Sequence, residues 1–132
     1  MGKHLVFVYG TLRQGGVRAM RGIFPEAKFV ARACVGGSLY DFGAYPGLLL
    51  CETGPQVAGE VYEVGEEILK RLDEIEEPAH YTRRPVEVSL GGQSVTCWIY
   101  EPALELYPRR TLIASGDWIE HAKTKTEWPE DV

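Results

Sequence analysis

Cysteine is scarce in this chain and occurs in no recognisable metal-binding or disulfide pattern. The three cysteines, Cys34, Cys51 and Cys97, are odd in number and far apart, and no Cys-x-x-Cys pair is present. This spacing disfavours a disulfide framework and a zinc knuckle. The three histidines also lack metal-ligand spacing with one another or with the cysteines. The sequence therefore predicts no metal site, and it predicts buried thiols in a reducing cytoplasm.

Long apolar runs and an excess of basic charge are also missing. No apolar stretch approaches the roughly 18 residues that suggest a membrane helix, and the first four residues show no signal-peptide design. The formal net charge is −5, which leaves no broad basic surface for a phosphate backbone. We therefore expect a cytoplasmic protein that binds neither membranes nor nucleic acid.

The common nucleotide-binding and nucleophile motifs are incomplete. Gly10 and Gly15 have the spacing of a phosphate loop, but Gly16 and Val17 stand where Lys and then Ser or Thr are required. Neither a dinucleotide fingerprint of three spaced glycines nor a Gly-x-Ser-x-Gly elbow occurs. The sequence thus predicts no nucleotide cofactor and no serine nucleophile of this type.

The composition and hydrophobic patterning of the chain are typical of one small globular domain. Hydrophobic residues make up 45% and charged residues 25% of its 132 residues. The predicted elements are a buried strand at 5–8, irregular structure at 17–28, several short strands within 29–50, a strand at 56–64, a helix at 66–77 stopped by Pro78, a hairpin of 86–90 with 95–100, and a short helix at 118–123 that begins at Ser115 or Asp117.

Many short strands beside one well-patterned helix favour an α+β fold whose sheet curls into a small barrel. We expect a single domain over residues 1–122 and a charged C-terminal tail over 123–132 that frays at its end. The tyrosines and Trp98 fall mainly on strand positions, where aromatic residues usually belong to the core. We therefore assign Tyr45, Tyr100 and Tyr107 to the core rather than to a pocket.

The helix at 66–77 carries one carboxylate on its apolar side. At about 100° per residue its leucines and isoleucines share one sector, and Glu76 falls inside that sector. A carboxylate turned toward a core loses solvation of its charged form, which raises its pKa toward the range useful for proton transfer. Alternatively, the side chain escapes to solvent or pairs with Arg83 or Arg84. Glu76 is the first candidate for a catalytic residue.

A second candidate feature is the loop that follows the first strand. Residues 9–15 leave a buried strand, a position from which successive backbone N–H groups can converge on an anion. The alternative is a plain glycine turn. The pattern alone does not choose between these two interpretations.

Taken together, these features resemble the gamma-glutamylcyclotransferase-like (AIG2-like) family. The Tyr-Gly-Thr-Leu loop at the end of the first strand is fairly specific, and it is paired with a Leu-Asp-x-x-Glu segment some 60 residues later. The resemblance runs in order from Val6 to about Trp118. The segments that carry it are residues 6–15, 39–43, 45–46, 59–62 and 72–76, together with Tyr81 and Arg83.

The resemblance implies a small mixed β-barrel with flanking helices and a cavity at one end. It implies that Glu76 is the catalytic base and that Tyr9, Gly10, Thr11 and Leu12 hold the substrate, largely through their backbone. Tyr81 and Arg83 are further candidates for substrate contact. The chain departs from the family pattern directly after the base, because it carries Glu77 where Gly is common.

The implied reaction is the cyclisation of a γ-glutamyl compound. The free α-amine attacks its own γ-carbonyl, which closes a five-membered lactam and releases 5-oxoproline and an amine or amino acid. No cofactor is implied, and the partner is a small γ-glutamyl substrate. The alternative is a metabolite-binding module that keeps the cavity but does not turn over. The leaving amine depends on the cavity mouth, which we expect residues 17–28 to form.

Overall fold

The computed structural model describes residues 2–125. Its elements are β1 (Lys3–Val8), α1 (Met20–Ile23), β2 (Lys28–Asp41), β3 (Pro46–Leu50), β4 (Gln56–Gly65), α2 (Glu66–Glu76), the 3-10 turn η1 (Glu77–Ala79), β5 (Tyr81–Leu90), β6 (Gln93–Pro102), the 3-10 turn η2 (Leu104–Leu106), β7 (Thr111–Leu112) and α3 (Trp118–Lys123). No helix in this part of the chain is long and apolar enough to cross a membrane.

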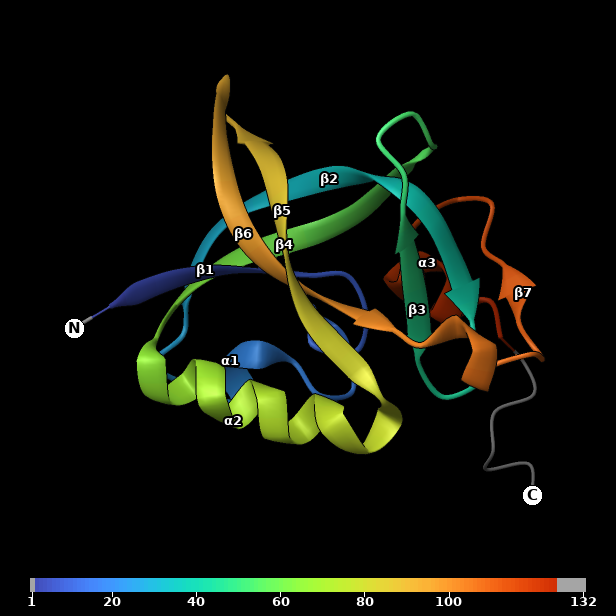
Figure 1. Cartoon of the computed structure of the whole chain (residues 1–132), viewed down its shortest axis with the longest axis horizontal. Helices are drawn as coiled ribbons and strands as arrows, with labels where there is room; N and C mark the ends of the chain where they lie inside the picture. Colours follow the sequence, from blue (N-terminus) through green and yellow to red (C-terminus); the bar gives the residue numbers. More distant parts are fainter. Residues whose placement is uncertain (1, 126–132) are drawn as a thin grey trace.

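The strands form one curled, mixed sheet in the order β3-β2-β4-β1-β6-β5, with β7 added on β2. β1 runs parallel to β6 and antiparallel to β4, and the other neighbouring strands are antiparallel. The long strand β2 pairs first with β4 and then bends to pair with β3, while α2 lies below β1 and the crossing β5–β6 hairpin (Figure 1). The predicted α+β class with a curled sheet and flanking helices is confirmed.

β1 is buried on both faces, which explains its unbroken apolar sequence. Phe7 points into a core that is shared by the curled sheet and Trp118 of α3, and this residue is almost fully buried. Val6 and Val8 point to the other side, into a core that includes Leu69 and Leu72 of α2. Because period-2 alternation sends successive side chains to opposite faces, the strand needs apolar residues throughout. This strand ends at the rim of the second core.

The predicted short strands within 29–50 are wrong in number, because β2 runs unbroken through the glycine pair. A Cβ on Gly36 would lie 2.5 Å from the carbonyl oxygen of Cys51, and one on Gly37 would lie 2.6 Å from that of Leu49. These glycines therefore allow a close approach between strand backbones and do not mark turns. The hairpin prediction is confirmed, with Gly91 and Gly92 at φ values of 57° and 88° in its turn.

Two further predictions need correction. Cys34 and Cys51 are exposed, and only Cys97 is a buried thiol. Cys34 lies on the outward face of β2 opposite Ala58, and Cys51 follows the end of β3, so neither position faces a core. The irregular structure expected at 17–28 contains the one-turn helix α1. The charged segment predicted at 123–132 falls mainly outside the described residues.

Candidate active site

A cavity of about 450 Å³ lies where β1 and α2 end and β3 begins. Its wall comes from five stretches of chain: the end of β1 with the 9–12 loop, residues 17–18, residues 44–46, the turn from α2 to β5, and Tyr100 of β6. Six of the seven predicted site residues line it, namely Tyr9, Gly10, Thr11, Leu12, Glu76 and Tyr81. The two features that the sequence singled out therefore face one cavity.

Glu76 is the last residue of α2 and faces inward, as its helical phase predicts. Its exposed fraction is 8%, and it accepts no hydrogen bond and forms no ion pair within residues 2–125. Its carboxylate is not sealed off, since it lines the cavity. Burial raises the pKa of Glu76 above its usual range, and the positive charge of Arg18 opposes this increase. The site thus holds a carboxylate with unused acceptor capacity.

The alternative partners considered for Glu76 are held elsewhere. Arg83 Nε lies 3.2 Å from Asp73 Oδ1, and its guanidinium sits 4.4 Å from the centroid of the Trp98 ring. Arg84 Nε lies 3.1 Å from a carboxylate oxygen of Glu101. The structure therefore does not bring Arg83, a candidate for substrate contact, to the cavity wall. Glu77 is exposed and is also absent from the wall.

The 9–12 loop is fixed at its start by the buried hydroxyl of Tyr9. This hydroxyl donates to the carbonyl oxygen of Tyr100 at 2.7 Å and accepts from the backbone N–H of Leu48 at 3.3 Å. A Cβ on Gly10 would lie 2.6 Å from Cγ of the buried Pro46, so a side chain at this position does not fit. The chain can follow this path only because residue 10 is glycine.

The loop satisfies its carbonyl groups and leaves its N–H groups available. The carbonyl oxygens of Gly10, Thr11 and Leu12 accept backbone hydrogen bonds from Arg13, Arg18 and Met20 at 2.8–3.0 Å. Within the described chain, no atom accepts a hydrogen bond from the N–H groups of residues 10–12. Consecutive unpaired N–H groups at a cavity wall favour the binding of an anionic or polarised oxygen.

Aromatic rings form the wall on the side of β3 and β5. Tyr81 donates from its hydroxyl to the carbonyl oxygen of Pro46 at 2.6 Å, and burial raises its pKa. Tyr107 donates to the carbonyl oxygen of Ala79 at 2.6 Å, and Tyr45 is 3.2 Å from that same hydroxyl. Tyr45 and Tyr100 line the cavity, so their assignment to the core alone was incomplete. Strand periodicity does not distinguish a ring that lies wholly in the core from a ring that also faces a cavity.

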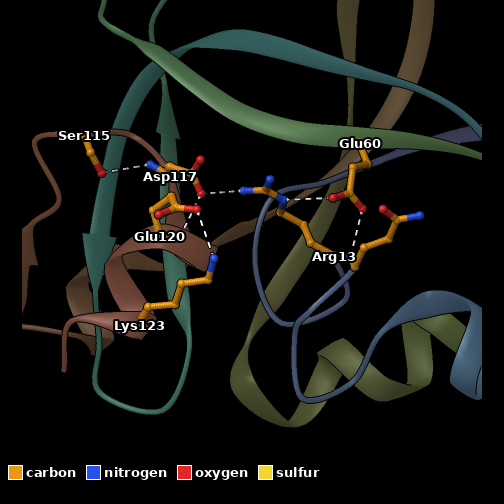
Figure 2. A network of polar contacts seen from close by, with 7 residues as sticks. Arg13, Glu60, Ser115, Asp117, Glu120 and Lys123 are labelled. Carbon is orange, nitrogen blue, oxygen red and sulfur yellow. Dashed lines mark hydrogen bonds and ion pairs between the residues drawn. The ribbon is translucent and has the colours of Figure 1, made fainter. Parts of the chain in front are cut away.

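Sequence reasoning missed a buried ion network behind the 9–12 loop. The Arg13 guanidinium lies 3.2 Å from a Glu60 carboxylate oxygen and 2.9 Å from Asp117 Oδ1. Figure 2 shows Arg13 between these two carboxylates, which come from β4 and from the start of α3. Glu60 also accepts from the Gln14 N–H and from the Tyr62 hydroxyl at 3.0–3.1 Å. We call Arg13, Glu60 and Asp117 the Arg13 network.

A signal for this network was present in the alternation of residues 56–64. Glu60 shares its strand face with Tyr62, which is fully buried, so an acid on that face needs a buried partner. The partner, Arg13, is 47 positions away in sequence, and its identity depends on the tertiary fold. Asp117 also begins α3, because its side chain accepts from the Glu120 N–H at 3.1 Å. This confirms one of the two predicted helix starts.

Within residues 2–125, no group of three histidine, cysteine or acidic side chains is arranged to hold a metal ion. The cavity wall instead offers one carboxylate, one guanidinium, unpaired backbone N–H groups and tyrosine rings. This arrangement can bind a small polar molecule and can exchange a proton with it through Glu76.

The family model described as "Gamma-glutamyl cyclotransferase, AIG2-like" matches residues 6–120. A Vibrio cholerae protein described as a candidate gamma-glutamylcyclotransferase is 40% identical over 126 residues, which cover 89% of this chain and 97% of that protein. The gamma-L-glutamyl-butirosin B gamma-glutamyl cyclotransferase of Niallia circulans is 53% identical over 74 residues, which cover 54% of this chain and 45% of that protein.

Solved structures agree with these sequence matches. An AIG2-like protein from Mus musculus superposes with a TM-score of 0.73 at 26% identity, covering 100% of this chain and 95% of that one. The fold of that protein therefore corresponds to the fold of this chain over the whole length. The sequence match, the fold and the inward Glu76 beside the 9–12 loop agree, and we conclude that this chain belongs to the gamma-glutamyl cyclotransferase, AIG2-like family.

Proposed function

We propose that the chain is a γ-glutamyl cyclotransferase in which Glu76 is the catalytic base. The observation that carries this proposal is the unpaired, buried carboxylate of Glu76 in the same cavity as the unpaired N–H groups of residues 10–12. The substrate is a γ-glutamyl amide, and the products are 5-oxoproline and the released amine.

The first step requires a free amine. The α-amine of a γ-glutamyl compound is largely an ammonium group at neutral pH, so it must lose a proton before it can attack. Glu76 accepts this proton, and its raised pKa makes it a better base than an exposed carboxylate. The amine then attacks the γ-carbonyl carbon of the same molecule, and a five-membered ring closes.

The second step breaks the amide bond. The protonated Glu76 gives its proton to the leaving nitrogen, and the carbon–nitrogen bond breaks. The restored carboxylate then takes the second proton of the ring nitrogen and passes it to the released amine, which departs as an ammonium ion. One substrate becomes one lactam and one amine, so the reaction balances without water, an oxidant or a reductant. For this reason we propose that it proceeds without a cofactor.

The N–H groups of residues 10–12 contribute by stabilising the carbonyl oxygen. Negative charge develops on this oxygen when the amine attacks, and fixed donors in a cavity stabilise such charge strongly. The hydroxyl of Tyr9 and the Arg13 network hold the ends of the loop in place. Because nucleophile and electrophile belong to one molecule, holding the folded conformer is the other main contribution of the cavity. Tyr81, whose hydroxyl is anchored on Pro46, limits the space for this conformer.

The proposal is tested by measuring 5-oxoproline release from a panel of γ-glutamyl amides and γ-glutamyl amino acids. We expect Glu76→Gln to reduce kcat by about 10²- to 10⁴-fold, the usual contribution of a general base. Glu74→Gln, an exposed acid on the same helix, is the matched control and should retain activity. An active Glu76→Gln protein contradicts the role of this residue, and ligand-induced thermal stabilisation without product supports the binding-module alternative.

A further inference from the structure

Arg18 lines the cavity, and the proposed reaction assigns it no role beyond the effect of its charge on the pKa of Glu76. It follows Val17, which is 84% exposed at the mouth of the cavity. Its backbone N–H donates to the carbonyl oxygen of Thr11 at 2.9 Å, and its Nε donates to Thr11 Oγ1 at 3.3 Å. Two hydrogen bonds to one residue of the 9–12 loop therefore hold the guanidinium beside the cavity.

The rest of this guanidinium is unused. Throughout the described chain, its terminal nitrogens donate no hydrogen bond, and no carboxylate forms an ion pair with it. Arg18 also carries the only cationic side chain among the described residues that line the cavity. A guanidinium that is held at Nε and open at its two terminal nitrogens presents a fork, which suits a carboxylate.

The position of Arg18 relative to Glu76 limits which carboxylate it can reach. Its charge acts on Glu76 across the cavity, and Glu76 must also approach the leaving nitrogen in order to protonate it. In an α-amino acid the carboxylate is attached to the carbon next to that nitrogen. A guanidinium at the mouth and near Glu76 is therefore placed for a carboxylate on the leaving group.

On the basis of the proposed function, we propose that Arg18 is a specificity-determining residue that binds the carboxylate of an α-amino-acid leaving group. The substrate class is then γ-glutamyl α-amino acids and peptides, in preference to γ-glutamyl derivatives of uncharged or cationic amines. Cationic leaving groups are disfavoured because they approach a fixed positive charge. The glutamyl part keeps its contacts with residues 10–12, which are buried, whereas Val17 beside Arg18 is exposed.

The test uses two substrates that differ only in this carboxylate. γ-Glutamyl-alanine and γ-glutamyl-ethylamide share the same glutamyl part, and ethylamine is alanine without its carboxylate. We expect the unmodified protein to prefer γ-glutamyl-alanine. Arg18→Gln should reduce kcat/KM for γ-glutamyl-alanine by about 10- to 100-fold, the value of a charge-assisted pair, and should change kcat/KM for the ethylamide far less. For γ-glutamyl-alanine, the kcat/KM of Arg18→Lys should lie between the values of the unmodified protein and Arg18→Gln. Lysine keeps the positive charge but cannot form the paired hydrogen bonds of a guanidinium.

The assays are run at an alkaline pH at which Glu76 is ionised in both proteins, because removal of Arg18 also alters the pKa of Glu76. Arg32→Gln, an exposed arginine on β2, is the control for a general loss of positive charge. An equal loss on both substrates overturns the proposal, since it places Arg18 on the glutamyl part. An unchanged preference in Arg18→Gln overturns it as well.

Binding measurements separate this proposal from the proposed catalytic function. Calorimetry on Glu76→Gln, with and without Arg18→Gln, compares the affinities for the two compounds in the absence of turnover. The proposal requires that γ-glutamyl-alanine binds more tightly than the ethylamide and that Arg18→Gln removes the difference. If the unmodified protein releases no 5-oxoproline but this difference is found, the proposed reaction fails and the role of Arg18 stands. Equal affinities in both proteins contradict that role.

Discussion

Glu76 occupies a buried position where its negative charge destabilises the fold, but where it can exchange a proton with a molecule in the cavity. It is buried and lacks a hydrogen-bond donor within the described residues, yet it borders a cavity. A structural carboxylate at such a depth is usually paired, because an unpaired buried charge destabilises the fold. The proposed function explains this exception, since a base must keep its oxygen atoms available for the substrate.

The pH dependence of the reaction should reflect this environment. Burial raises the pKa of Glu76 above its ordinary value of 4.5, and only the ionised form accepts a proton. We therefore expect kcat/KM for 5-oxoproline release to fall on the acid side with an apparent pKa above 4.5. Arg18→Gln should move this limb to higher pH, because the arginine charge lowers the pKa. An apparent pKa at or below 4.5 on the acid side of the profile contradicts this explanation.

The same burial predicts an effect on stability. A carboxyl group whose pKa is raised by folding stabilises the fold fully below its unfolded pKa, and this contribution is lost as the pH rises through the folded pKa. Glu76→Gln should therefore raise Tm at neutral pH, by about 4 °C for each 1 kcal/mol removed. The difference should vanish below the ordinary pKa of 4.5. Thermal unfolding across pH measures this, with Glu74→Gln as the control that should show no such gain.

Single residues differ in how clearly the sequence identifies their position in the site. Glu76 could be identified because its neighbours in the helix define an apolar sector, so the test is local. Arg18 could not, since its role comes from a hydrogen bond to Thr11 and from the cavity that the fold creates. Arg83 lies outside the cavity wall, because Asp73 and Trp98 hold it there, and these contacts also depend on the tertiary fold.

At the scale of elements, the 9–12 loop depends on the absence of a side chain at Gly10. A Cβ there would meet two ring carbons of Pro46 at 2.6 and 2.8 Å, and a proline ring at a buried position cannot move aside easily. Gly10→Ala should displace the loop and reduce kcat by about 100-fold, the effect of a shift near 1 Å. 5-Oxoproline release at saturating substrate measures this change.

Gly22→Ala is the matched control for this substitution. Gly22 lies in α1, and nothing is within 4 Å of a Cβ at that position. Its activity should equal that of the unmodified protein. Full activity of Gly10→Ala would show that the geometry of the loop does not matter for turnover.

The Arg13 network connects the 9–12 loop to two other elements, β4 and α3. Glu60→Gln leaves the buried Arg13 guanidinium without one of its two carboxylates. Breaking a buried pair in this way costs about 3 kcal/mol or more. We expect a loss of this size in urea unfolding, together with a fall in kcat that exceeds the change in KM.

Glu63→Gln is the control for this variant, because Glu63 is a half-buried acid on the same strand. It should unfold at the same urea concentration as the unmodified protein. If Glu60→Gln loses stability but keeps its full kcat, the network supports the fold and has no influence on the loop.

At the scale of the whole molecule, local patterns predicted the elements that a single segment determines. The β5–β6 hairpin, α2 and the buried β1 follow from alternation, helical phase and apolar runs. The continuity of β2 through Gly36 and Gly37 does not, because those glycines are needed where β2 approaches residues of another segment. The cavity also escapes local reasoning, since five separate stretches of chain form its wall.

The resemblance to the family supplied what the local patterns lacked, namely that Glu76 and the 9–12 loop belong to one site. The structure brings them to one cavity, and the family match covers residues 6–120. The boundary predicted at residue 122 stays a prediction. Lys125 lies 3.1 Å from a carboxylate oxygen of Asp41, so contacts with the sheet extend at least to residue 125.

The identity of the product tests the central claim most directly. Cyclisation of γ-glutamyl-alanine yields 5-oxoproline and alanine in equal amounts, whereas attack by water yields glutamate and alanine. Proton NMR of the reaction mixture distinguishes the two outcomes, and N-acetylation of the substrate removes the attacking amine. We predict 5-oxoproline from the free substrate, none from the N-acetylated one, and none above background with Glu76→Gln. Formation of glutamate, or undiminished 5-oxoproline formation by Glu76→Gln, would contradict the account.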